Sequence, residues 1–446
     1  MIERKKIFTA GFWIIGAYGL SQLLRLGSNL VVTRLLEPEL FGLMTIVYVV
    51  MHGITMFSDL GFWAFIVRHK GGTEEKVLDT VWTMQVVRGW LIFIVVLLMA
   101  LAFNIVNGLK ISLGDIYGNE RLPTLLIIVG FNALVSGYKT MAPALESREL
   151  KRGRLELIEL MAQICGASVM LVWAWKYPSI WALVSAGVIA TIVSVTLTYG
   201  LFSYRHKHAW NKEVVKEVFT FGKWIFIASA FTYLAQQGDR LIFANYISAA
   251  ELGVYSIAFM LIGVFSSIID QLASKIGLPV FSQIVRNNPE KLKEKYYFIR
   301  LRQDFIVFIV IGILIATAPF IIEFLYDERY YEAGWMLQIL AVSLVGFVLS
   351  RLGLSCLTAL GSTKIRMKIM VMKSLMIFIG LPLFWHFYGF IGAVWAVTLS
   401  AFVAIPIQYI EMNKYSIFSF IKEVRVLPVV YMSYYLSNIF VNEVLV

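Results

Sequence analysis

The sequence has little charge for its length. Asp, Glu, Lys and Arg together supply 15% of its 446 residues, whereas apolar residues supply 59%, and the mean hydropathy is +0.77. Soluble domains carry about 25% charged residues, so this composition excludes an ordinary soluble domain. It predicts a polytopic membrane protein.

Cysteine and histidine are also scarce. Cys165 and Cys356 are the only cysteines, each lies in an apolar segment, and their spacing fits neither a disulfide framework nor a metal site. The five histidines form no H-E-x-x-H pattern, and the sequence contains no Walker A loop. We therefore expect no enzyme activity, no bound metal and no resident cofactor.

Long apolar runs are abundant. A membrane-spanning helix needs about 20 largely apolar residues, and this criterion predicts an all-α protein with twelve spans. The spans lie near residues 8–33, 40–67, 80–104, 122–145, 157–175, 180–203, 219–246, 252–282, 304–325, 334–360, 369–385 and 390–410. The last segment, 426–446, predicts either an interfacial helix or a thirteenth span.

Basic residues are distributed unevenly between the two sides of these spans. Of the 39 Lys and Arg, 26 lie in loops on the side of the N-terminus, 5 on the other side and 8 within spans. The positive-inside rule then places the N-terminus in the cytoplasm, together with loops such as 146–154 and 287–302. We interpret nearly all the loop cations as a solvated face beside anionic lipid headgroups, and we expect no nucleic-acid partner.

The chain also repeats itself. "FTAGFW" near the start recurs as "FTFGKW", and the same offset aligns Gly42 with Gly253 and Asp59 with Asp270. Each copy holds six spans, so both copies enter the membrane from the same side, and we predict two six-helix bundles around a central cavity. The predicted parts are an N-lobe over 1–206, a C-lobe over 207–425 and the terminal segment 426–446.

One face of the first predicted helix is polar. Gln22, Arg25 and Asn29 follow i, i+3, i+7 spacing, so they form one stripe. The repeat places Gln236 and Arg240 in the equivalent stripe of the seventh helix. A charge in hydrocarbon costs roughly 3 kcal/mol, so this position predicts an aqueous or protein-lined environment.

Asp239 directly precedes Arg240. Neighbouring residues of a helix do not face each other, so the two are not a self-contained ion pair. Each of them needs a partner from another helix, or water.

Six further cations lie within the predicted spans. Three lie two to four turns inside and predict a water-filled cavity, because snorkelling from there is strained: Arg88, Lys139 and Arg351. Three lie close to the inner boundary, where snorkelling is the simpler interpretation: Lys223, Lys275 and Lys373. A cavity lined by Arg and Lys suits an anion, because guanidinium groups bind phosphate oxygens through forked hydrogen bonds.

Acidic residues within the spans are few. Asp59 and Asp270 fall late in inward-running helices, near the cytoplasmic boundary. Two interpretations stay open for them. They form structural salt bridges or helix caps, or they act as a gate or as ligands of a coupling ion, sodium or a proton.

Three segments resemble a known family: "VVTRLLEPELFGLMTI", "FSDLGFWAFIVRHK" and "GDRLIFANYISAAELGVYSIA". They are similar to recurring segments of the Wzx-type polysaccharide flippases, within the multidrug/oligosaccharidyl-lipid/polysaccharide exporter superfamily. The resemblance implies two lobes around a cavity, open inward and outward in turn. It further implies transfer of undecaprenyl-diphosphate-linked oligosaccharide from the cytoplasmic to the outer leaflet of a bacterial inner membrane.

The resemblance also implies a site and partners. It assigns Arg25 to the cationic lining, and Asp239 and Arg240 to the signature of the C-lobe's first helix. The expected partners are the lipid-linked oligosaccharide and membrane lipids, with a polysaccharide polymerase and chain-length machinery as further candidates. The substrate-binding set expected from the sequence is Gln22, Arg25, Asn29, Arg88, Lys139, Gln236, Asp239, Arg240 and Arg351.

Two other functions fit the sequence less well. A cation-coupled drug exporter of the same superfamily would favour an acidic cavity, whereas this one is basic. An integral-membrane glycosyltransferase or polymerase would need catalytic acids or bases on an outward loop, and the short outward loops do not supply them. The sugar composition of the substrate and the driving ion or potential stay open.

Overall fold

The computed structural model describes residues 2–109, 114–149, 153–202, 204–273, 277–362 and 364–441, without the side chains of residues 2–15, 17–18, 224 and 272. Every regular element in these ranges is helical, as the sequence predicts. The chain divides into two compact units. One comprises Met1–Tyr233 and Phe243–Gly253, and the other comprises Leu234–Ile242 and Val254–Val446.

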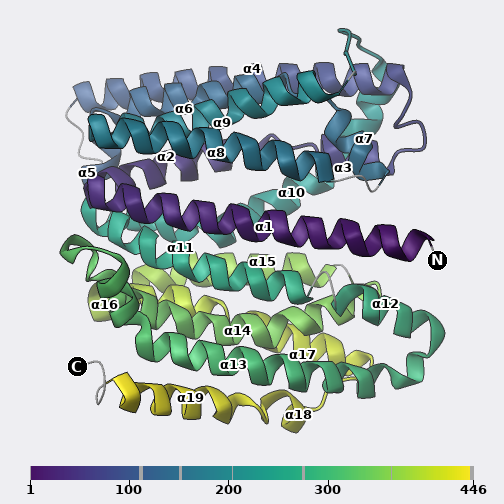
Figure 1. The fold of residues 1–446 in the computed structure, drawn as a ribbon, viewed down its shortest axis with the longest axis vertical. Helices are drawn as coiled ribbons and strands as arrows, with labels where there is room; N and C mark the ends of the chain where they lie inside the picture. The colour runs from purple at the N-terminus through teal and green to yellow at the C-terminus, as the bar shows by residue number, and fades with distance from the viewer. Residues whose placement is uncertain are drawn as a thin grey trace. The chain divides into compact units, whose positions relative to one another are not determined.

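The first unit contains α1 to α9 and most of α10 (Figure 1). Within it α4 packs on α6, and α8 packs on both α1 and α9. The bounds are α1 Ile2–Leu35, α2 Pro38–Phe57, α3 Phe62–Arg68, α4 Glu75–Gly108, α5 Gly114–Tyr117, α6 Leu122–Gly137, α7 Ala142–Arg148, α8 Gly153–Lys176, α9 Ile180–Leu201 and α10 Lys212–Phe243.

The second unit contains a short piece of α10 and the helices from α11 onward, except for the first turn of α11. Their bounds are α11 Ala249–Leu272, α12 Leu278–Asn287, α13 Leu292–Leu325, α14 Ala333–Ala359, α15 Lys364–Leu375, α16 Leu381–Ser400, α17 Ala404–Lys414, α18 Phe420–Val424 and α19 Leu427–Phe440. The 3-10 turns Pro289–Lys291 and Glu328–Tyr330 precede α13 and α14, and a π-helical turn, Met376–Gly380, joins α15 to α16. The lobe boundaries at residues 206 and 425 stay a prediction.

Nine helices of the described ranges are long and apolar enough to cross a membrane, or ten when α6 and α7, bent by 59°, count as one span. One of the nine, Lys364–Lys414, has 51 residues, or roughly 77 Å of helix against a hydrocarbon core of about 30 Å. Its backbone leaves the helical region at Gly389 (φ 61°, ψ −150°), and α17 packs back on α15. This segment therefore contains two of the predicted spans. Each of the twelve predicted spans coincides with a helix or a helix pair, and the number that crosses the membrane stays a prediction.

Two predicted spans are broken in ways that their apolar composition did not indicate. The segment 40–67 forms α2 and α3, separated by residues 58–61, and Gly61 adopts a left-handed conformation (φ 70°) that favours glycine. The segment 122–145 forms α6 and α7, separated by residues 138–141. The predicted loop 287–302 is wrong in part, because α13 already begins at Leu292.

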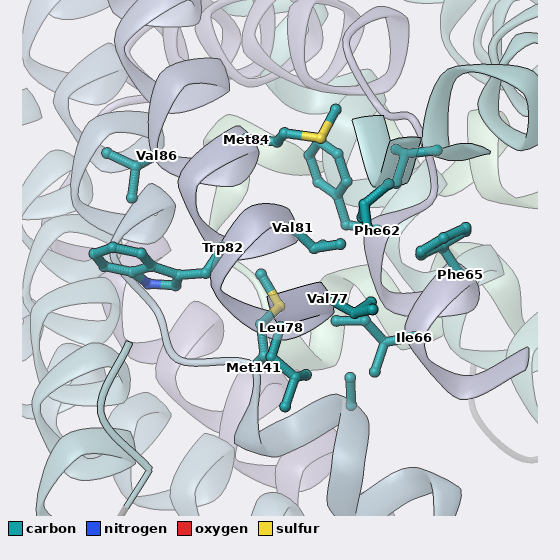
Figure 2. Packing of buried hydrophobic residues seen from close by; sticks show 13 residues of the cluster. Phe62, Phe65, Ile66, Val77, Leu78, Val81, Trp82, Met84, Val86 and Met141 are labelled. Carbon is teal, nitrogen blue, oxygen red and sulfur yellow. The ribbon is translucent and has the colours of Figure 1, made fainter. Parts of the chain in front are cut away.

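A buried apolar cluster fixes these short helices in the first unit where α3, α4, α7 and α10 meet. Figure 2 shows Leu78 and Val81 of α4 near Phe62 and Ile66 of α3, with Met141 beside them. Leu78, Val81 and Ile66 are fully buried, and truncating such a side chain to alanine typically costs about 2–5 kcal/mol. The cluster consists of Phe62, Phe65, Ile66, Val77, Leu78, Val81, Trp82, Met84, Val86, Met141, Ala144, Val214 and Val218.

The terminal segment forms α18 and α19, and its last five residues, 442–446, lie outside the described ranges. α19 has 14 residues, about 21 Å of helix, and it packs on α13. Ser433 Oγ donates a hydrogen bond to the carbonyl of Ile309 at 2.8 Å. The interfacial helix and the thirteenth span both stay predictions for this segment.

Candidate functional site

Asp239 is held inside the second unit by a tyrosine. Its side chain is buried, and Tyr255 Oη on α11 donates a hydrogen bond to Asp239 Oδ2 at 2.6 Å. The other carboxylate oxygen, Oδ1, is buried and has no hydrogen-bond partner in the described part of the chain. Asp239 thus finds one partner on another helix and keeps one oxygen without a partner.

Arg240 is directed toward a different neighbour. Its Nη1 donates to Gln237, and its guanidinium carbon lies 4.1 Å from the ring centroid of Phe259, within the range of a cation–π contact. These groups line a cavity of about 200 Å³. Its lining residues are Ala235, Gln236, Gln237, Asp239, Arg240, Phe259, Lys373, Ile377 and Val397.

A second cavity, of about 280 Å³, is built around an ion pair. Arg351 Nε of α14 lies 3.1 Å from Asp270 Oδ1 of α11, and the guanidinium carbon lies 4.3 Å from the ring centroid of Phe347. Ser266 and Ser267 of α11 also line this cavity. Gln236 and Lys373 line both cavities, so the two form one polar tract, which we call the basic tract.

The basic tract carries an excess of positive charge. Its cations are Arg240, Arg351 and Lys373, and its anions are Asp239 and Asp270. Among the described residues, Lys373 lies within ion-pair distance of neither carboxylate, whereas Arg351 is paired. A half-buried ammonium without a paired acid makes this tract suitable for an anion.

Lys373 was missed from the sequence, which indicated a snorkelling side chain. The prediction used only its position, four residues after the start of the predicted span 369–385. The feature that distinguishes Lys373 is visible only in the structure. The π-helical turn that follows Lys373 places Ile377 against the same cavity, and such turns often occur at functional sites. Lys275, which was predicted to snorkel as well, lies outside the described residues.

In the first unit, Arg88 is bound to the end of α2. Its Nη2 donates to the carbonyl of Thr55 at 2.6 Å, and its Nε donates to Ser58 Oγ at 3.0 Å. Its Nη1 lies 3.8 Å from Asp59 Oδ1, which also accepts the backbone N–H of Gly61 at 2.9 Å. Arg88 therefore satisfies one of the carbonyl groups that a helix C-terminus leaves without partners.

Asp59 and Asp270 share a feature that supports the structural interpretation. Each pairs with an arginine of its own unit, Arg88 and Arg351 respectively. All four side chains keep partial exposure, 44% and 45% for the acids and 23% for each arginine. They therefore keep access to solvent or a ligand.

Lys139 lies at the break between α6 and α7. Its Nζ lies 2.6 Å from Glu159 Oε1 and 2.9 Å from Ser194 Oγ. Gln85 Nε2 donates to the carbonyls of Gly137 and Lys139, both at 3.0 Å. A cavity of about 340 Å³, lined also by Trp63 and Thr140, opens beside this break.

The stripe on α1 belongs to the first unit. Arg25 is exposed and forms no ion pair with another described residue. Gln22 Oε1 and Asn29 Oδ1 are buried and have no hydrogen-bond partner in the described ranges. Of the residues expected from the sequence, the structure gathers Gln236, Asp239, Arg240, Asp270 and Arg351 in the second unit, and the remaining six lie in the first unit.

Comparisons with known proteins identify relatives over most of the chain. Residues 31–335 match the model of the family described as "Polysaccharide biosynthesis protein". The lipopolysaccharide biosynthesis protein WzxC of Escherichia coli is 23% identical over 93% of this chain and 82% of its own length. A Shigella flexneri protein described as a candidate O-antigen transporter is 23% identical over 79% of this chain and 85% of its own length.

The fold is also shared with a solved structure. The lipid II flippase MurJ, in an inward closed conformation, superposes with a TM-score of 0.72 over 98% of this chain and 100% of its own. The two sequences are 13% identical, so this similarity shows the fold alone.

Proposed function

Because the chain belongs to the polysaccharide biosynthesis protein family, we propose that it flips lipid-linked oligosaccharides across a bacterial inner membrane, from the cytoplasmic to the outer leaflet. The physical task is to shelter a diphosphate and its sugars while the polyprenyl chain stays in lipid. The names of WzxC and of the Shigella relative support a role in surface polysaccharide assembly. The fold shared with MurJ supports a transporter architecture.

The observation that carries this proposal is the charge of the basic tract. Arg240, Arg351 and Lys373 outnumber Asp239 and Asp270 in the lining of these two cavities. A diphosphate offers several acceptor oxygens, and charge-assisted hydrogen bonds from Arg and Lys to such oxygens are among the strongest in proteins. In our proposal Lys373 and Arg240 bind the diphosphate, and Gln236 hydrogen-bonds to it.

The proposed flippase opens to the two sides of the membrane in turn, and we propose that two ion pairs take part in this change. The pairs of Asp59 with Arg88 and of Asp270 with Arg351 stabilise one state, and the anion competes with the carboxylates for the guanidinium groups. The partially exposed geometry of both pairs supports such competition. Arg25, Gln22, Asn29 and Lys139 of the first unit stay candidate substrate-binding residues in this proposal.

Export in a deletion strain tests the proposal. We expect Lys373→Gln and Arg240→Gln to abolish surface polysaccharide while the protein stays in the membrane at wild-type abundance. Arg240→Lys should rescue export partly if charge alone is needed, and poorly if the forked geometry is needed. Lys368→Gln is the matched control, because Lys368 is an exposed lysine of the same helix.

Two outcomes would contradict the proposal. One is normal surface polysaccharide from both glutamine variants at wild-type abundance. The other is unchanged polysaccharide combined with increased sensitivity to cationic drugs when the whole protein is deleted. The second outcome would favour the drug exporter.

A further inference from the structure

Arg300 of α13 is fully buried between two carboxylates. Its side chain is 1% exposed, its Nε lies 3.1 Å from Asp304 Oδ2, and its Nη2 lies 2.8 Å from Glu423 Oε2. Asp304 lies one turn further along α13, and Glu423 lies in α18. The sequence predicted a solvated loop around Arg300, and this part of the prediction is wrong because α13 and α18 enclose the side chain. Its cytoplasmic side stays a prediction.

The two carboxylates are bound unequally. Glu423 Oε1 accepts a hydrogen bond from Tyr296 Oη at 3.4 Å, and Tyr296 Oη in turn accepts one from Arg300 Nη1 at 2.6 Å. Neither oxygen of Asp304 has a hydrogen-bond partner in the described part of the chain, and its side chain is 1% exposed. Asp304 is therefore the less stabilised of the two as a carboxylate.

The formal charge of this cluster does not balance. One guanidinium faces two carboxylates, which leaves one negative charge in a site closed to water. Among the described residues, Tyr297 of α13, Cys356 of α14 and Tyr409 of α17 also face this cluster, and none of these three supplies a positive charge. The exposed Lys422 lies outside it, with its Nζ 5.4 Å from the ring centroid of Tyr297. An uncompensated buried charge is strongly unfavourable, and such a group takes up a proton instead.

We infer that Asp304 is a proton-binding site, and that its proton strengthens the attachment of α18 and α19 to α13. A proton from water binds one carboxylate oxygen of Asp304, so that Arg300 is left to pair with Glu423 alone. The pair Arg300–Glu423 then connects α13 to α18, and α19 continues the contact along α13 through Ser433. When the proton leaves, Asp304 competes with Glu423 for the same guanidinium, and α18 is held less firmly.

This inference does not depend on the proposed function. It rests on burial, charge and missing hydrogen bonds within the second unit, so it can fail while oligosaccharide flipping is correct. The proton-binding site can equally be correct while oligosaccharide flipping fails.

Infrared spectroscopy of the purified full-length protein at neutral pH tests the inference. A protonated carboxylic acid in a dry site gives a carbonyl band that an ionised carboxylate lacks. We expect this band in the wild-type protein, its loss in Asp304→Asn and its retention in Asp115→Asn, whose aspartate is exposed. Absence of the band from the wild-type protein, or its persistence in Asp304→Asn, would overturn the inference.

The temperature of thermal unfolding provides a second test of the inference. Asparagine imitates neutral aspartic acid in shape, so Asp304→Asn should unfold near the wild-type temperature, whereas Glu423→Gln should unfold well below it. In the wild-type protein, protease cleavage at residues 415–419, which connect α17 to α18, should increase as the band disappears at alkaline pH. An Asp304→Asn protein that is destabilised as much as Glu423→Gln, or that cannot be recovered, would contradict the inference, because it would show that the carboxylate charge is needed.

Discussion

Gly42 of α2 and Gly253 of α11 lie against each other, backbone to backbone. A Cβ added at Gly42 would lie 1.7 Å from the carbonyl oxygen of Ala249, and one added at Gly253 would lie 1.9 Å from the carbonyl oxygen of Pro38. These two glycines occupy the same position in the two copies of the predicted repeat. The contact therefore joins the first turns of α2 and α11 within the first unit. The two backbones approach so closely that only glycine fits at either position.

Substitution of either glycine should destabilise the protein. We expect Gly42→Ala and Gly253→Ala to lower the free energy of unfolding by about 1–3 kcal/mol or more, as overpacking does, with a lower midpoint of thermal unfolding. Gly200→Ala in α9 is the control, because no atom lies within 4 Å of an added Cβ there. That variant should be neutral or slightly stabilised, and equal behaviour of all three variants would contradict the close contact.

The ion pair between Asp270 and Arg351 should show coupling between its two residues. We expect Asp270→Asn and Arg351→Gln each to impair export. The double variant should impair export less than the sum of the two single effects, because each single change removes one charge of the pair and the double change removes both. Surface polysaccharide and membrane abundance, measured for the four proteins of the cycle, check this expectation. Strict additivity would mean that the two side chains act independently.

His206 should make the first unit sensitive to mild acid. Its Nε2 accepts the backbone N–H of Met141 at 3.0 Å, and its Nδ1 lies 3.3 Å from Asp79 Oδ1. The ring is therefore neutral, with its proton on Nδ1. Burial lowers the pKa of His206 below its usual value of 6.5, although the hydrogen bond to Asp79 opposes this effect.

The sign of the effect follows from linkage. The unfolded chain binds the proton at a higher pH than the folded one, so stability is complete above about pH 6.5 and decreases as the pH falls toward the folded pKa. The unfolding temperature, measured from neutral to mildly acidic pH, should fall in the wild-type protein and in His386→Gln but change less in His206→Gln. A His206→Gln protein with the wild-type pH dependence would contradict this assignment.

The helical segments follow from the sequence because apolar length is a local property. The breaks in α2–α3 and α6–α7 do not follow from it. They depend on single features such as the left-handed Gly61 and on partners far along the chain, such as Gln85, which binds the carbonyls at the second break. A criterion based on mean apolarity averages over these residues.

The candidate site was predictable only in part, because the sequence shows how deep a charge lies in an apolar run but not what packs around it. Arg240 and Arg351 were recognised because a charge deep in an apolar run has few explanations. The burial of Arg300 was misjudged because this residue lies near a predicted span end, where a charge usually reaches water. A similar position gave Lys373 its snorkelling interpretation, which stays a prediction. The structure shows that Arg300 is enclosed by α13 and α18, and that the half-buried Lys373 lines both cavities.

Reconstitution of the purified protein tests lipid-linked oligosaccharide flipping most directly. Proteoliposomes would contain the lipid-linked oligosaccharide extracted from the strain that encodes the protein, and an impermeant reagent would measure its transfer between leaflets. We predict transfer well above protein-free vesicles, and a loss of about tenfold or more in Lys373→Gln, because a hydrogen bond to a charged group contributes roughly 1.5–3 kcal/mol. Transfer equal to that of protein-free vesicles, or an unchanged rate in Lys373→Gln, would contradict flipping through the basic tract.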